Sequence, residues 1–181
     1  HSSALVHFSA NNNNVNIRDN SMSTGIAAAS SVGGGLGPQG SAAVSDPFGG
    51  SNKVLHFTGD DYLKFGAGSD MAPEQYSFGT GDFTIETWIR WTDFQTGGRN
   101  VVDWRPRGGA GNYPNIYQNG STIYYHVSGN RITSTDPVSI NTWYHLAVCR
   151  AGTSTKMFIN GSQTGSTYSD STDYVCGIRR P

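Results

Sequence analysis

Charged residues are scarce in this sequence. Asp, Glu, Lys and Arg make up 14% of its 181 residues, against roughly 25% in an average soluble domain. The formal net charge of −1 lacks the basic excess that nucleic-acid binding requires, so we expect no nucleic-acid partner. Long apolar runs are missing as well. None approaches the roughly 20 residues of a membrane-spanning helix, so we expect no membrane span.

Cysteine and glutamate are also rare. The two cysteines, Cys149 and Cys176, could form one disulfide or remain two thiols, and they cannot make a zinc site alone. The only glutamates are Glu74 and Glu86, and no GxSxG nucleophile motif occurs. The sequence therefore offers little for catalysis, and we expect a protein that is not an enzyme.

Short alternating segments are what the chain does contain. In the run from Phe83 to Trp91, Phe83 and Ile85 fall on one side of a period-2 strand, while Glu86 and Trp88 fall on the other. Glycine-rich and polar segments bound this run at both ends. Similar short strands are expected near 4–8, 15–18, 54–57, 60–65, 100–104, 115–118, 122–127, 143–150, 156–160 and 166–168. This spacing predicts an all-β sandwich or barrel without long helices.

Two Asn-Gly pairs predict tight hairpins. Asn119–Gly120 and Asn160–Gly161 each stand between two alternating runs, and type I′ turns need positive φ at both central residues. Each pair is followed by serine, which also completes an N-x-Ser glycosylation pattern. We favour the turn as the reason for both pairs.

The segment from Ser21 to Gly50 is rich in Ser, Ala and Gly and has few large apolar residues. It predicts a long surface excursion or flexible linker. The alternative is an ordered arm that packs on a neighbouring subunit.

Several segments resemble the laminin-G-like jelly roll of the concanavalin A-like lectin and glucanase superfamily. They follow the family's order: ALVHF, DNS, FGGSNKVLHFTGDDYLKF, FGTGDFTIETWIRW, RITSTDPVSINTWYHLAVCRAGTSTKMFINGSQTGS and YSDSTDYVCGIRRP. The resemblance implies one jelly-roll domain over 1–181, built as an antiparallel two-sheet sandwich. The family's final strands, which resemble YIG and GYIDDVRI, do not follow Pro181. We therefore expect a sandwich that lacks its closing C-terminal strands, within a longer polypeptide.

The resemblance also bears on chemistry. Glucanases of this superfamily use an ExDxxE-type motif on one strand, because a retaining mechanism needs two carboxyl groups about 5 Å apart. Trp88 stands where that spacing would place an aspartate after Glu86. Many relatives bind calcium through oxygen ligands. Asp60, Asp61 and Asp103 are possible ligands here, although Asp60 also suits a turn and Asp61 the start of a strand.

Two groups of residues are candidates for binding a sugar, which needs an aromatic surface and hydrogen-bonding groups. By alternation, Trp88, Tyr124 and His126 could line one outer face. Alternatively, Trp88 and Tyr124 could simply be cross-strand neighbours or be covered by a loop. The second and slightly preferred group occupies a glycine-rich loop region, where Trp104 could instead cap the core. Its members are Asp103, Trp104, Arg105, Arg107, Asn112, Tyr113 and Asn115.

The expected function is carbohydrate recognition or adhesion without catalysis, in a bacteriophage virion or an extracellular bacterial assembly. The expected partners are a glycan or cell-surface polysaccharide and other subunits of the assembly, including copies of the same chain. No cofactor is required in this interpretation, with Ca²⁺ as an optional ion. The alternative is a purely structural jelly roll, and a glycan-cleaving enzyme is the third hypothesis.

Overall fold

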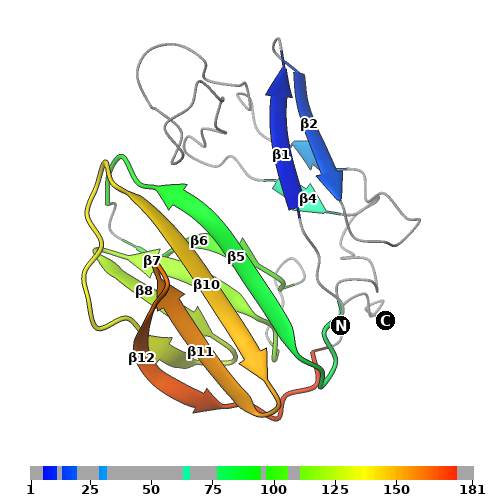
Figure 1. Cartoon of the computed structure of the whole chain (residues 1–181), viewed down its shortest axis with the longest axis vertical. Coiled ribbons are helices and arrows are strands. Elements are labelled where there is room, and N and C mark those ends of the chain that lie inside the picture. The colour runs from blue at the N-terminus through cyan, green and yellow to red at the C-terminus, as the bar shows by residue number, and fades with distance from the viewer. Residues whose placement is uncertain are drawn as a thin grey trace. The chain divides into compact units, whose positions relative to one another are not determined.

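The computed structural model describes residues 77–94, 97–105 and 111–174, together with the backbone of four short strands nearer the N-terminus. The chain divides into two compact units, one of residues 3–76 and one of residues 77–181 with residues 1–2. Figure 1 shows the strands of each unit. Within the described ranges, no helix has the length and apolarity needed to cross a membrane.

The first unit contains two antiparallel pairs of strands. Strand β1 (Val6–Asn11) pairs with β2 (Asn14–Asp19), which confirms the strands expected near 4–8 and 15–18. Strand β3 (Ala29–Ser31) pairs with β4 (Leu63–Phe65). The predicted excursion over residues 21–50 therefore includes a strand, because β4 supplies partners for its backbone. The strand expected at 54–57 lies outside the described residues.

The second unit is a sandwich of two antiparallel sheets with four strands each. Sheet I has the order β12-β11-β10-β5 and sheet II has the order β6-β7-β8-β9. Sheet I consists of β5 (Phe83–Arg90), β10 (Trp143–Ala151), β11 (Ser154–Ile159) and β12 (Ser162–Ser169). Sheet II consists of β6 (Arg99–Asp103), β7 (Asn115–Asn119), β8 (Thr122–His126) and β9 (Asn130–Thr133). The predicted all-β, two-sheet fold is confirmed, although β9 was not predicted.

The core lies between the two sheets and follows the alternation of each strand. In β5, Phe83 and Ile85 are 4% and 6% exposed, while Glu86 and Trp88 point outward. In Figure 1, sheet I lies in front of β6, β7 and β8. Side chains from both sheets fill the space between them: Phe83, Ile85, Ile116, Ile123, Tyr125, Ile132, Leu146, Val148 and Met157. Burial of this apolar surface is the main stabilising contribution.

The two sheets come close together where β12 passes β9. Gly165 in β12 has a positive φ of +67°, and a Cβ atom there would overlap the carbonyl oxygen of Thr133 in β9. Next to it, the Thr135 amide donates a hydrogen bond to Thr164 Oγ1 at 2.9 Å. Only glycine fits this backbone conformation and this approach without strain.

The two Asn-Gly hairpins differ. Asn160 and Gly161 have φ of 51° and 80° and form the two-residue turn between β11 and β12, which confirms the predicted type I′ geometry. Asn119, in contrast, is the last residue of β7 and pairs with Thr122. The turn residues there are Gly120, with φ of 58°, and Ser121. Glycine at the first turn position is typical of type II′, so the type I′ prediction for this hairpin was wrong.

A buried arginine forms hydrogen bonds to both the first and the last segment of the described sandwich. Arg150 of β10 donates hydrogen bonds to the carbonyl oxygens of Gly79, Gly81 and Thr172. Its Nη1 lies 3.8 Å from Asp170 Oδ2, and neither of these two side chains is exposed. The buried guanidinium therefore satisfies three backbone carbonyl groups through charge-assisted hydrogen bonds.

Candidate functional site

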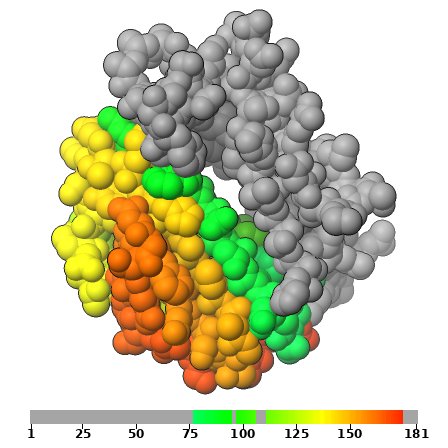
Figure 2. Space-filling view, in the orientation of Figure 1, coloured from blue at the N-terminus to red at the C-terminus, as the bar shows by residue number. Residues whose placement is uncertain are grey.

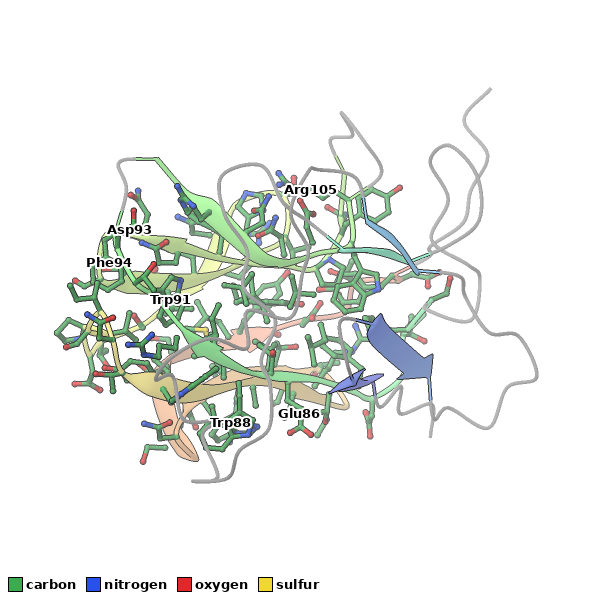
Figure 3. The ribbon with its side chains drawn as sticks, turned by 90° about the horizontal axis from the view of Figure 1, so that it is seen from above. Glu86, Trp88, Trp91, Asp93, Phe94 and Arg105 are labelled. Atoms are coloured by element: carbon green, nitrogen blue, oxygen red, sulfur yellow. The ribbon has the colours of Figure 1, made fainter. Side chains whose placement is uncertain are left out.

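The three aromatic residues predicted on one outer face belong to different sheets. Trp88 lies on β5 in sheet I, whereas Tyr124 and His126 lie on β8 in sheet II. Figure 3 shows Glu86 and Trp88 on one side of the sandwich and Arg105 on the other. The predicted shared surface was therefore wrong, and so was the alternative that Trp88 and Tyr124 are cross-strand neighbours. The cross-strand partners are His145 for Trp88 and Tyr117 for Tyr124.

The outer face of sheet I, which is turned toward the viewer in Figure 2, presents Trp88. Its side chain is 42% exposed, and its ring lies 5.2 Å from the His145 ring. His145 Nε2 is 3.4 Å from Glu86 Oε2. This face offers a single exposed indole beside a histidine and a carboxylate.

The outer face of sheet II contains a hollow of about 260 Å³. Strands β6, β7 and β8 and the residues on either side of β6 supply its lining, which comprises Gly98, Asn100, Arg105, Asn115, Tyr117 and His126. The strand register explains why these side chains meet: Asn100 is opposite Tyr117, and Asn115 is opposite His126. Facing positions in adjacent antiparallel strands place their side chains side by side. The hollow is thus built on sheet positions and not on a loop alone.

One wall of the hollow is aromatic. The Tyr117 ring stacks on Tyr124, with centroids 4.8 Å apart and planes at 13°. His126 meets the same Tyr117 ring edge-on at 6.1 Å. The Tyr117 hydroxyl donates to Asn130 Oδ1 at 2.8 Å, which fixes the ring in place. A held aromatic surface of this kind suits the apolar C–H face of a sugar ring.

Asn115 provides an unmet hydrogen-bond acceptor. The residue is 2% exposed, and its Nδ2 donates to Asn100 Oδ1 at 2.9 Å. Its Oδ1 is buried and has no hydrogen-bond partner. A buried polar atom without a partner costs about 1–3 kcal/mol. A ligand that donates a hydroxyl hydrogen to this oxygen would recover that cost.

An ion pair forms the charged part of the hollow. Arg105 Nη2 lies 2.7 Å from Asp103 Oδ2, and Arg105 Nε donates to Asp103 Oδ1 at 2.9 Å. The Arg105 backbone amide also donates to Asp103 Oδ1 at 2.9 Å, and Asn100 Nδ2 donates to Asp103 Oδ2 at 3.1 Å. The hydrogen bond that Arg105 donates to Asp103 raises the pKa of Arg105 above its ordinary value. The pair is therefore ordered and carries no net charge.

His126 is held in its neutral form. Burial lowers the pKa of its imidazole, and the nearby positive charges of Arg105 and Arg131 lower it further, while Asp103 acts in the opposite direction. A neutral imidazole can both donate and accept a hydrogen bond. At neutral pH it can therefore face a sugar hydroxyl in either role.

The second predicted group is only partly brought together. Arg105 and Asn115 line the hollow with Asp103 behind Arg105. Trp104 instead packs against the core, with its ring 5.4 Å from that of Phe78. Tyr113 is half-buried, and its ring lies against Gly111. The alternative that Trp104 caps the core describes its contacts better than a ligand role does.

Three residues of the hollow, Gly98, Asn100 and Tyr117, were missed. Tyr117 is two positions after Asn115 in the same strand, so the period-2 rule that placed Trp88 could have placed both on one face. Asn100 could not have been found this way, because it comes from β6 and its partner strand is unknown from the sequence.

The predicted calcium ligands, Asp60 and Asp61, lie outside the described residues, as does Arg107. In the described part of the chain, no three His, Cys, Asp or Glu side chains come together to hold a metal ion. Asp103 is not suited to be a calcium ligand in its present contacts, because both of its oxygens already accept hydrogen bonds from Arg105.

Comparison with known proteins gives a family and no individual relative. Neither the curated proteins nor the solved structures include a significant match. A family model described as the concanavalin A-like lectin/glucanases superfamily, of the laminin G type, matches residues 57–175, which is more than half of the chain. This match covers the whole described sandwich and agrees with its two antiparallel four-stranded sheets. The chain therefore belongs to the concanavalin A-like lectin/glucanase superfamily.

Proposed function

We propose that this protein is a non-catalytic carbohydrate-binding module and that the hollow on sheet II is its sugar site. Membership of a lectin and glucanase superfamily suggests binding of the carbohydrate type. The fold itself does not fix the ligand, so the proposal depends on the site. The observation that carries it is the buried, unpartnered Asn115 Oδ1 next to the stacked ring of Tyr117.

The contacts of this hollow favour binding over chemistry. Glycoside hydrolysis needs two carboxyl groups placed on either side of the scissile bond. None of the described residues that line the hollow carries a carboxylate, and Arg105 occupies both oxygens of Asp103 behind it. Glu86 is on the opposite sheet and faces His145. The donors and acceptors of the hollow therefore suit recognition of hydroxyl groups without bond cleavage, and we propose that this recognition needs no calcium ion.

The proposal is tested by titrating the purified full-length protein with the ligands found on a glycan array. Tyr117→Ala removes the aromatic wall, and Asn115→Leu removes the acceptor at nearly constant size. Each change is expected to weaken binding by about tenfold, which corresponds to about 1.4 kcal/mol. Trp88→Ala is the matched control, because it removes an exposed aromatic ring from the opposite sheet and should leave the affinity unchanged. Equal losses in all three variants would contradict the assignment of the site.

The exposed face of sheet I favours a second candidate function, which is contact between subunits. Trp88 is 42% exposed on this face, and Trp is enriched at the centres of protein interfaces. We infer that such contacts would operate in an extracellular or virion assembly of adhesive or structural character. Light scattering of the wild type and of Trp88→Ala tests this idea. Assembly that depends on Trp88, together with no response to any glycan, would favour the structural role.

A further inference from the structure

We propose that Asp103 makes the hollow selective for a neutral, hydroxyl-rich sugar ring over an acidic one. This inference rests on the proposed sugar site. Asp103 is then a specificity-determining residue, although it does not line the hollow itself. The inference follows from how Asp103 holds Arg105, from the chemistry that Asn115 requires, and from the size of the hollow.

The first argument concerns the guanidinium of Arg105. An arginine recognises a carboxylate best through two parallel N–H bonds from one edge of its planar fork. In this protein the edge formed by Nε and Nη2 already faces Asp103, at 2.9 and 2.7 Å. A uronate arriving at the hollow therefore cannot use that edge unless it displaces Asp103. The carboxylate of the uronate would also lie near the negative charge of Asp103, which is behind Arg105. Two like charges so close together are unfavourable.

The Asp103 carboxylate is held on both sides and is not available to rotate away. Asn100 Nδ2 donates to Oδ2 at 3.1 Å, and the Arg105 backbone amide donates to Oδ1 at 2.9 Å. Asp103 is also the last residue of β6 and pairs with Asn115 in the strand register. The sheet backbone thus holds the Asp103 carboxylate, which neutralises Arg105, next to Asn115, whose Oδ1 has no hydrogen-bond partner.

The second argument concerns what the hollow lacks. Asn115 Oδ1 is an acceptor without a donor, and a carboxylate has no hydrogen to give it. A sugar hydroxyl satisfies this atom directly. His126 adds no fixed positive charge, because burial and the neighbouring Arg105 and Arg131 lower the pKa of its imidazole. The lining therefore offers a carboxylate no net positive charge, and the Nε–Nη2 edge of Arg105 is already occupied. It offers hydroxyl groups both donors and acceptors.

The third argument is size. At about 260 Å³, the hollow is smaller than the roughly 300–1,000 Å³ that is typical of sites for drug-sized ligands. It suits a single ring, such as a terminal or exposed residue of a glycan. Discrimination can therefore be measured with simple methyl glycosides.

The test compares matched pairs of probes at pH 7.5: methyl hexosides and the methyl hexuronides with the same ring configuration. Wild-type protein is expected to bind the neutral member about tenfold more tightly or better, which is about 1.4 kcal/mol. Asp103→Asn frees the positive charge of Arg105 and should shift this ratio toward the uronide by about tenfold. Arg105→Gln leaves Asp103 unpaired and should shift it in the opposite direction. Circular dichroism of both variants checks that the sandwich is intact.

Asp136→Asn is the matched control for net charge. It makes the same change of charge in the loop after β9, where the carboxylate contacts Thr135 and not the hollow. It should leave the ratio unchanged. If neither class of sugar binds the wild type, the proposed function itself is overturned. If sugars bind but the wild type does not prefer the neutral member, or Asp103→Asn shifts the ratio no more than Asp136→Asn does, this inference alone is overturned.

Discussion

Replacement of Arg150 by methionine is expected to destabilise the sandwich severely. The guanidinium donates to three backbone carbonyl groups at 2.7–2.9 Å and lies over the rings of Phe83 and Tyr174 at 5.0 and 4.9 Å. Methionine fills much of the same volume but provides no donor. The three carbonyl oxygens would then lose their charged hydrogen-bond donor.

The largest part of the expected loss comes from Asp170. Its side chain is fully buried, 3.8 Å from Arg150, and removal of one partner of a buried ion pair costs about 3–5 kcal/mol. Hydroxyl donors from Thr155 and Tyr174, each at 2.8 Å, would still contact this carboxylate. We therefore expect a loss of about 3–5 kcal/mol, a large share of the 5–15 kcal/mol that stabilises a typical domain.

Urea denaturation followed by tryptophan fluorescence measures this loss. Arg131→Met is the matched control, because Arg131 also contacts a carbonyl oxygen, that of Val127 at 2.8 Å, and stacks over a tyrosine at 5.4 Å, but is exposed. Its replacement should cost less than about 1 kcal/mol. The double variant Arg150→Met/Asp170→Asn should lose less than the sum of the single variants, since the unpaired charge is gone. Equal losses for Arg150→Met and Arg131→Met would refute the reasoning.

Three further predictions concern turns, packing and titration. Gly165→Ala should cost clearly more stability than Gly120→Ala: both residues have positive φ, but only at Gly165 would the new Cβ overlap the β9 backbone. Urea midpoints that are lowered equally would contradict that packing. Asn160→Ala should cost about 1 kcal/mol more than Asn119→Ala, because, of these two residues, only Asn160 has positive φ, and its Oδ1 accepts a hydrogen bond from the His145 amide of β10. A similar cost at both sites would count against the two turn assignments. The pKa of Tyr174 is raised to about 12, with burial as the largest cause, and thus lies above the ordinary value of about 10. Stability that is complete below pH 10 should therefore fall between about pH 10 and 12, as the unfolded chain releases a proton that the folded chain retains. Urea midpoints across this range should fall less steeply in Tyr174→Phe, and identical slopes would contradict the shift.

The sequence predicts the strands well because alternation is a local property. Phe83, Ile85, Leu146 and Val148 are buried as the period-2 rule requires, and this rule needs no knowledge of neighbouring strands. The type I′ prediction for the turn at Asn119 was wrong because it depended on strand register, which is not a local property. An Asn-Gly pair fits two registers that differ by one residue, and the pairing of Asn119 with Thr122 decides between them. That pairing depends on which side chains the whole sheet buries.

The site is harder to predict because it depends on which strands are neighbours. Alternation places Trp88 and Tyr124 on outward faces correctly, but it does not reveal that these faces belong to opposite sheets. Asn115 was selected together with a loop region and begins β7, as the strand expected at 115–118 implies, but the sequence does not show that it lies beside His126 of β8. Its unmet acceptor arises only when Asn100 from β6 takes the amide hydrogen. Such a combination of three strands has no local signal in the sequence.

The central claim is that the hollow on sheet II binds sugar, and isothermal titration of one array-identified glycan with three proteins tests it most directly. The account predicts that the wild type and Trp88→Ala bind alike, while Tyr117→Ala binds about tenfold more weakly, a loss of about 1.4 kcal/mol. Equal affinity of the wild type and a folded Tyr117→Ala, with binding lost in Trp88→Ala, would contradict it and move the site to the opposite sheet.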